Sequence, residues 1–269
     1  MKRPPQLDSE EYPLVARKER PDTVVGIGSA TVGDGFCLIA GPCAVESEEQ
    51  IDETARFVAT EGAAVLRGGV FKPRTSPYAF QGTGLDGLHT MRRAADAARI
   101  PLVTEVPSPE LVDAMLPLVD AFQIGARNMQ NFPLLKAVGH CDRPVILKRG
   151  FASTLTEWLL AAEYIADAGN EAIILCERGI RTFGGELRFT LDLAGALWAR
   201  RKTHLPIIID PSHATGHPDL VAPLVHAAHA AGLQGAMVEV HPHPHRALCD
   251  ASQALDKPAF TALTETLPI

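Results

Sequence analysis

Eight short apolar runs, each followed by a longer segment with helical spacing, constrain the fold of this chain more than any other feature. The runs span three to five residues each, at 37–40, 63–66, 102–104, 121–124, 145–147, 172–175, 207–209 and 236–240. Continuous apolar runs of this length are typical of parallel strands that are buried on both faces. Their alternation with helical segments is the pattern of an α/β protein.

The segments between the runs have the polar and apolar spacing of amphipathic helices. We expect helices at 47–61, 85–99, 109–116, 131–138, 155–168, 191–202 and 218–231, and a short helix at roughly 250–255. Eight strand–helix units in about 230 residues predict a (β/α)₈ barrel. A doubly wound open sheet is the alternative, but the glycine-rich turn that binds ligands in that fold is missing.

The N-terminal region differs from the repeating part of the chain. Residues 1–23 are polar and rich in proline, and we interpret them as a short extended arm. Residues 24–36 hold four glycines between short apolar pieces and predict a small hairpin. These glycines are not a dinucleotide fingerprint, because Thr31 stands where a third glycine would be needed. We therefore expect one catalytic barrel domain over 24–269, with the hairpin included.

Composition excludes several classes of protein. The formal charge is −7 over 269 residues, whereas general nucleic-acid and acidic-membrane binders have a basic surplus. No apolar run reaches the roughly 18 residues of a transmembrane helix, and the polar start lacks the apolar stretch of a signal peptide. Five cysteines without a framework spacing favour reduced thiols. We expect a cytoplasmic enzyme that binds neither nucleic acid nor membranes.

Basic side chains gather where the predicted strands end, which is where (β/α)₈ barrels carry their active sites. The cations at this end are Arg67, Lys72, Arg74, Arg127, Lys148, Arg149, Arg178 and Arg181. Such a cationic bowl in an acidic protein indicates small ligands with several negative charges, such as phosphates or a phosphate with a carboxylate. For Arg149 and Arg181, an ordinary ion pair is an equally good interpretation.

A second set of residues near the strand ends offers metal ligands. It consists of Cys43, His213 and Glu239, with Asp250 just beyond the last strand. One thiolate, one imidazole and two carboxylates suit a divalent transition metal such as Mn, Fe, Co or Zn. The alternatives are a buried apolar cysteine, a histidine that caps a loop, and an aspartate that caps a helix. A carboxylate that ends a buried strand, as Glu239 does, needs a partner.

The remaining cysteines and a histidine-rich segment receive ordinary interpretations. We interpret Cys37, Cys141, Cys176 and Cys249 as structural or incidental. We interpret His241, His243 and His245 as part of a solvated proline-rich loop, although a metal site is the alternative.

Seven segments at the strand ends resemble those of the 3-deoxy-D-arabino-heptulosonate 7-phosphate (DAHP) synthases, type I beta subgroup, which also contains the octulosonate 8-phosphate synthases. They include Gly-Pro-Cys-Ala-Val-Glu-Ser at 41–47 and Asp-Pro-Ser-His-Ala-Thr-Gly at 210–216. The others are at 66–69, 72–76, 123–128, 147–150 and 177–181. The resemblance extends in order from about residue 24 to 256.

The resemblance implies a transferase that condenses phosphoenolpyruvate with erythrose 4-phosphate and water, the first step of the shikimate pathway to aromatic amino acids. It implies a divalent metal on Cys43, His213, Glu239 and Asp250. It implies phosphoenolpyruvate contacts at Arg67, Lys72, Arg127, Lys148 and Arg178, and aldose phosphate contacts at Arg74 and Thr75, with Asp210 near the sugar hydroxyls. Lys148 and Glu105 are candidates for proton transfer and water placement. We also expect a homo-oligomer, a dimer or tetramer, with chorismate mutase as a candidate partner.

Three other functions stay open at this point. An octulosonate 8-phosphate synthase would use arabinose 5-phosphate, but its loop resembles Lys-Ala-Asn-Arg-Ser-Ser, whereas residues 72–76 read Lys-Pro-Arg-Thr-Ser. A Schiff-base aldolase would use Lys148 and no metal. A non-catalytic phosphate sensor would need to lack Cys43, His213, Glu239 or Lys148, and all four are present.

Overall fold

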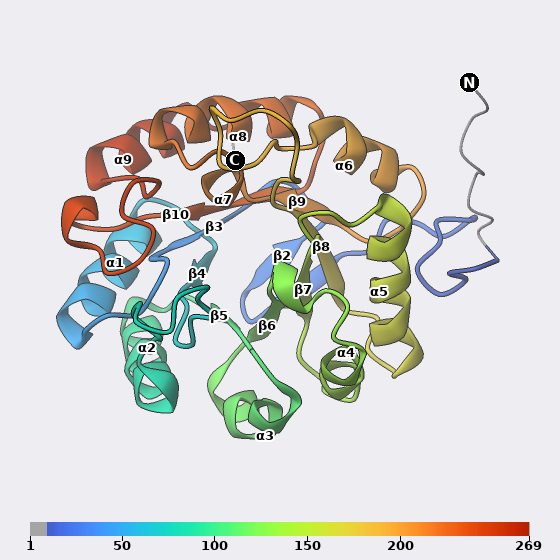
Figure 1. Cartoon of the computed structure of the whole chain (residues 1–269), viewed down its shortest axis with the longest axis horizontal. Helices are drawn as coiled ribbons and strands as arrows, with labels where there is room; N and C mark the ends of the chain where they lie inside the picture. Colours follow the sequence, from blue (N-terminus) through green and yellow to red (C-terminus); the bar gives the residue numbers. More distant parts are fainter. Residues whose placement is uncertain (1–9, 269) are drawn as a thin grey trace.

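Eight parallel strands close into a barrel whose strand order follows the sequence, and the helices form a ring outside it (Figure 1). The strands are β3 (Cys37–Gly41), β4 (Val65–Arg67), β5 (Leu102–Glu105), β6 (Ala121–Ile124), β7 (Val145–Lys148), β8 (Ile173–Glu177), β9 (Ile207–Ile209) and β10 (Gly235–Glu239). β10 pairs with β3 over five residue pairs and closes the barrel. The expected (β/α)₈ fold is confirmed, and each expected strand lies within two residues of an observed one at both ends.

The computed structural model describes residues 10–268, so the first nine residues of the expected arm and the last residue of the chain lie outside the described residues. Within them, residues 10–16 pack against the barrel, with Tyr12, Val15 and Ala16 buried. The backbone N–H of Leu14 donates to the Glu163 carboxylate at 2.9 Å. No helix of the described part is long and apolar enough to cross a membrane.

Seven expected helices are confirmed between the strands. They are α1 (Glu48–Thr60), α2 (Gly84–Ala98), α3 (Val112–Met115), α4 (Phe132–Gly139), α5 (Leu155–Asp167), α6 (Leu193–Arg200) and α8 (Val221–Ala230). Side-chain caps explain several of their starts: Ser47 accepts from the Gln50 N–H, and Thr154 with Glu157 forms a capping box on α5. α3 is a single turn between two short 3₁₀ segments.

The expected helix at 250–255 is wrong. Asp250 has a φ of 52°, which is left-handed backbone and not helical. Leu255 instead pairs with the end of β10, because its N–H donates to the Glu239 carbonyl at 2.8 Å. The helix begins after this pairing, as α9 (Lys257–Thr266), with Asp256 as its N-cap. A further short helix, α7 (Pro211–Thr215), was not expected and begins at the N-cap Asp210.

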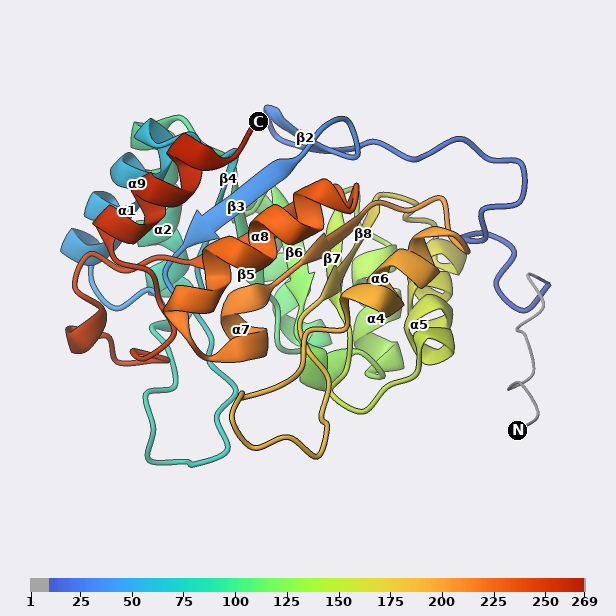
Figure 2. The ribbon, with the colours of Figure 1, turned by 90° about the horizontal axis from the view of Figure 1, so that it is seen from above.

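A hairpin closes the N-terminal end of the barrel. β1 (Val25–Ile27) and β2 (Ala30–Val32) pair antiparallel, which confirms the expected hairpin. Val25, Ile27 and Val32 pack in one cluster with side chains of the barrel interior such as Ile39 and Ile146. The long loops after β4 and β8 project from the opposite end (Figure 2). Apolar side chains thus fill the barrel interior at the hairpin end, and the opposite end, where the strands finish, opens into a cavity.

Candidate active site

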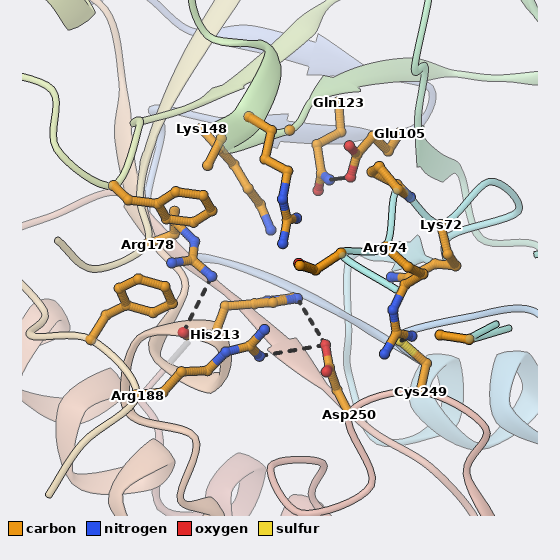
Figure 3. Close-up of a pocket in the computed structure, with 18 of the residues that line it drawn as sticks. Lys72, Arg74, Glu105, Gln123, Lys148, Arg178, Arg188, His213, Cys249 and Asp250 are labelled. Atoms are coloured by element: carbon orange, nitrogen blue, oxygen red, sulfur yellow. Dashed lines mark hydrogen bonds and ion pairs between the residues drawn. The ribbon is translucent and has the colours of Figure 1, made fainter. Parts of the chain in front are cut away.

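A cavity of about 320 Å³ opens at the C-terminal ends of the strands. Most of the residues expected from the sequence line it: Arg67, Lys72, Arg74, Thr75, Glu105, Arg127, Lys148, Arg178, His213 and Asp250. Figure 3 shows the labelled side chains converging from opposite walls, with Glu105 and Lys148 on one side and His213 and Asp250 on the other. The barrel therefore brings together residues that are more than 180 positions apart in the chain.

Four potential metal ligands meet at one side of this cavity. One ligand atom each from Cys43, His213, Glu239 and Asp250 lies within 4.8 Å of the other three. His213 Nε2 is 3.1 Å from Glu239 Oε1 and 3.9 Å from Asp250 Oδ2. Cys43 Sγ is 3.3 Å from Asp250 Oδ2. We name these four residues the candidate metal centre.

Asp210 fixes the His213 ring, since its Oδ2 is 2.7 Å from Nδ1 while Oδ1 accepts from the His213 backbone N–H. A proton held on Nδ1 leaves Nε2 free to face the rest of the candidate metal centre. Asp210 is fully buried and is absent from the cavity wall, and its expected place near the sugar hydroxyls stays a prediction. Burial alone would raise the pKa of Asp210, but His213 and Lys148 outweigh it and hold that pKa well below its ordinary value.

Glu239 is held equally firmly. Its Oε1 accepts from Arg67 Nη1 at 2.8 Å and its Oε2 accepts from Gln253 Nε2 at 2.6 Å. Burial would raise the pKa of Glu239, but His213 and Arg67 lower it overall, so the carboxylate is the stable form. Gln253 was not expected from the sequence, because it lies 14 residues after Glu239 and does not directly follow a strand.

Cys43 lies beside a second thiol, that of Cys249, for which the sequence indicated a structural or incidental role. The Cys43 Sγ is 3.2 Å from Cys249 Sγ, and Cys249 lines the cavity, a position that was not expected from the sequence. The hydrogen bond with Cys249 and burial together raise the pKa of Cys43 well above its ordinary value. Lys72 Nζ donates to the Cys43 carbonyl and sulfur at 3.0 Å each.

The cations of the cavity differ in their partners. Lys148 Nζ pairs with Asp210 at 2.5 Å, and Arg74 Nη1 donates to Cys249 Sγ at 2.7 Å. Within residues 10–268, neither Arg127 nor Arg178 forms an ion pair with a carboxylate. These two arginines therefore keep their charge available for an anion in the cavity.

Two of the eight expected cations of the bowl lie elsewhere. Arg149 Nη1 pairs with Glu177 Oε2 at 2.9 Å and with Asp192 Oδ2 at 2.8 Å, away from the cavity wall. Arg181 is exposed and does not line the cavity either. The Arg149 pairs join the two ends of the long loop between β8 and α6, so its role in this arrangement is structural.

We expect Arg149→Met to lower the free energy of unfolding by about 3 kcal/mol or more, because it leaves two buried or half-buried carboxylates without their counter-charge. Urea denaturation at neutral pH measures this difference. Arg181→Met is the matched control, since an exposed substitution changes stability by about 0.5 kcal/mol or less. Equal losses in the two variants would contradict the structural role of Arg149.

The long loop between β8 and α6 supplies cavity residues that were not expected from the sequence. Arg188 reaches Asp250 Oδ2 at 3.5 Å, as Figure 3 shows, and donates to Gln253 Oε1 at 2.6 Å. Phe189 lines the cavity beside it. Both residues lie more than ten positions after the end of β8, so they do not directly follow a strand and carry no signal of a site in the sequence.

The histidine-rich segment is only partly solvated. His243 and His245 are exposed, as expected. His241 is buried, with Nε2 3.5 Å from Glu46 Oε2, so the solvated interpretation is wrong for this residue. Glu46 Oε1 also accepts from the Leu248 N–H, and these contacts hold the segment that leads to Asp250.

Comparisons with known proteins identify the family of this chain. The model of the DAHP synthetase I family matches residues 18–267. A phospho-2-dehydro-3-deoxyheptonate aldolase of Thermotoga maritima is 50% identical over 258 residues, which cover 95% of this chain and 76% of that protein. A 2-dehydro-3-deoxyphosphooctonate aldolase of Syntrophotalea carbinolica is 32% identical over 255 residues, which cover 87% of this chain and 91% of that protein.

Solved structures give the same result. The crystal structure of DAHP synthase from Thermotoga maritima superposes with a TM-score of 0.91 at 50% identity, covering 94% of this chain and 74% of that one. A truncated form of 3-deoxy-D-arabino-heptulosonate 7-phosphate synthase from the same organism superposes with a TM-score of 0.88 at 46% identity. The match covers 95% of this chain and 94% of that one. With a family model that spans nearly the whole chain and a relative that shares half of its residues, the chain belongs to the DAHP synthetase I family.

Proposed function

We propose that this chain is a 3-deoxy-7-phosphoheptulonate synthase and that the cavity at the C-terminal end of its barrel is the active site. The reaction joins phosphoenolpyruvate, erythrose 4-phosphate and water and releases phosphate, as the first step of the shikimate pathway. The observation that carries the proposal is the meeting of the candidate metal centre with a wall of cations in one cavity. Membership of the family supports it.

The candidate metal centre suits a divalent transition metal. Its donor set is one sulfur, one imidazole nitrogen and two carboxylates, and Asp210 and Gln253 orient two of the ligands, as outer partners do in metal sites. A divalent ion held there would act as a Lewis acid on the aldehyde oxygen of the sugar. We propose Cys43, His213, Glu239 and Asp250 as its ligands.

We propose that the cations hold the two substrates in line. Arg127 and Arg178, with their free charge, bind the negative groups of phosphoenolpyruvate, and Arg67, Lys72 and Lys148 complete its site. Arg74 and Thr75 bind the phosphate of the aldose from the loop after β4. Fixing both substrates makes attack of C3 of phosphoenolpyruvate on C1 of the aldose nearly unimolecular.

The later steps need water and proton transfer. As C3 attacks, positive charge develops at C2 of phosphoenolpyruvate, and a water oxygen bonds to that carbon. The resulting hemiketal phosphate then loses phosphate by cleavage of its C–O bond. Glu105, whose Oε2 accepts from Gln123 Nε2 at 3.1 Å, lies in the cavity wall where it can place this water and accept its proton. Lys148 is the proposed donor of the proton that the aldose oxygen takes up when C3 bonds to C1, and Asp210 positions Lys148.

The test of this function is phosphate release from phosphoenolpyruvate, with and without erythrose 4-phosphate. We expect release only when both substrates are present. A Schiff-base aldolase would instead be trapped by borohydride with a keto substrate, through Lys148 as a neutral amine. The ion pair between Lys148 and buried Asp210 opposes that chemistry. Covalent trapping of Lys148 would contradict the proposed function.

We expect Asp210→Asn to weaken Mn²⁺ binding about tenfold, because it removes the charge that orients His213 as a ligand. Electron paramagnetic resonance of free Mn²⁺ measures the dissociation constant in the purified chain. Asp219→Asn, at an exposed position in the loop before α8, is the matched control and should leave binding unchanged. Equal affinity in both variants would rule out Asp210 as a positioning residue.

Three further expectations concern the surroundings of the enzyme. We propose that it works in the cytoplasm as a homo-oligomer, a dimer or tetramer, and that a chorismate mutase is its candidate partner. These stay predictions, and size measurement in solution with and without such a partner tests the last two.

A further inference from the structure

Arg178 is an arginine with an unusual environment. It is 4% exposed, and burial lowers its pKa to about 10. Other buried arginines of the chain have carboxylate partners, as Arg67 has in Glu239 and Arg149 in Glu177. Arg178 has one hydrogen bond from Nη2 to the His213 carbonyl at 3.3 Å, and its buried Nη1 has no partner within residues 10–268.

Two aromatic rings take the place where a carboxylate would be expected. The guanidinium carbon of Arg178 lies 4.8 Å from the centre of the Phe151 ring and 4.4 Å from the centre of the Phe189 ring. The two rings stack on each other at 5.0 Å with an angle of 8° between their planes. Such contacts attract a guanidinium without neutralising its charge and without using its N–H donors.

Backbone contacts fix both rings, although they come from different loops. Phe151 lies after β7, and its carbonyl accepts from the Arg181 N–H at 2.7 Å. Phe189 lies after β8, and its N–H donates to the Ala214 carbonyl at 2.7 Å. The two loops and α7 thus hold the rings in one place at the cavity wall, where Phe151 also lies 5.4 Å from the guanidinium carbon of Arg127.

We propose that Phe151 and Phe189 are positioning residues, an aromatic clamp that holds Arg178 and leaves its charge and N–H groups free for phosphoenolpyruvate. A carboxylate in the same place would compete with the substrate for the guanidinium. The clamp also restricts the side-chain freedom of a long residue, so less entropy is lost when the anion binds. This inference rests on the proposed function, since it assigns Arg178 to phosphoenolpyruvate.

The test replaces the rings and measures the two substrates separately in the metal-loaded full chain. We expect Phe189→Leu and Phe151→Leu each to raise the KM for phosphoenolpyruvate about tenfold, as loss of a desolvated cation–π contact implies. The KM for erythrose 4-phosphate and kcat should stay within about twofold, because no reacting group changes. Calorimetry with phosphoenolpyruvate alone should show the same loss of affinity.

Two variants control for effects that do not involve Arg178. Phe183→Leu lies in the same loop as Phe189 but is fully exposed, and it should leave both KM values unchanged. Phe189→Tyr keeps the ring face and should stay close to wild type. Thermal unfolding of every variant identifies any that fail to fold, and Phe151→Leu, from the other loop, tests the clamp on its own if Phe189→Leu is one of them.

Several outcomes would overturn the clamp. They are equal effects of Phe189→Leu and Phe189→Tyr, equal effects of Phe189→Leu and Phe183→Leu, or equal rises in KM for both substrates. The failure of the proposed function is distinguishable, because a wild-type chain that binds no phosphoenolpyruvate contradicts that function before any variant is compared.

Discussion

Removal of divalent metal should abolish phosphate release from phosphoenolpyruvate and erythrose 4-phosphate, and Mn²⁺ should restore it. The reason is the candidate metal centre, where four donor atoms from distant parts of the chain lie within 4.8 Å of one another. The measurement is activity after dialysis against EDTA, followed by titration with Mn²⁺. Full activity in demonstrably metal-free protein would contradict the assignment of Cys43, His213, Glu239 and Asp250.

The sharpest variant for this prediction is Cys43→Ala. It removes one ligand and only a small volume, so we expect loss of Mn²⁺ binding and of activity while the barrel stays folded. Cys176→Ala is the matched control, because Cys176 is equally buried in the barrel but belongs to no ligand cluster within residues 10–268. Mn²⁺ binding by the Cys43 variant with wild-type affinity would exclude Cys43 as a ligand.

The metal-free protein has to be kept reduced in this experiment. The sulfur atoms of Cys43 and Cys249 are 3.2 Å apart, and a thiol ligand without its metal is open to oxidation. If Mn²⁺ fails to restore activity after exposure to air, the loss is therefore explained by oxidation of the thiols. Mn²⁺ has to be added under a reductant before the metal requirement is judged.

The strands could be predicted from the sequence because a doubly buried strand needs a continuous apolar run, and such runs are visible without a structure. Ile207–Ile209 shows this in its simplest form, as three isoleucines that became β9. The segment after β10 could not be predicted in the same way. Its conformation follows from contacts of Asp250, Gln253 and Leu255 with distant residues, which override local helical preference.

The candidate site was predictable where residues directly follow a strand, and Arg149 shows the limit of that rule. Lys148 ends β7 and lines the cavity, but the next side chain points to the other face of the sheet. Arg149 there meets Glu177 and Asp192. Arg188 does not directly follow a strand, yet it lines the cavity, because the long loop between β8 and α6 folds back toward it. The sequence around Arg188 has no local pattern that predicts this position.

Erythrose 4-phosphate should be preferred over arabinose 5-phosphate by at least about a hundredfold in kcat/KM, since a misplacement of about 1 Å can cost that factor in rate. The candidate metal centre would hold the aldehyde end of the sugar, while Arg74 and Thr75 line the wall that would hold its phosphate. Arg74 Nη1 donates to Cys249 Sγ, and this sulfur contacts that of Cys43, so Arg74 lies close to the candidate metal centre. Pro73 fixes its own φ near −65° and so keeps Arg74 and Thr75 from moving outward.

Arg74→Ala separates the two substrates of this reaction. It should raise the KM for erythrose 4-phosphate far more than the KM for phosphoenolpyruvate, because the other cations of the cavity stay in place. Arg93→Ala, at an exposed position on α2, is the matched control and should change neither constant. We expect a four-carbon phosphate to reach both ends of the site, and a five-carbon one to leave either its phosphate unpaired or its carbonyl out of place. Equal kcat/KM for the two sugars would contradict the predicted preference, and an Arg74→Ala defect confined to phosphoenolpyruvate would contradict the assignment of Arg74 to the aldose phosphate.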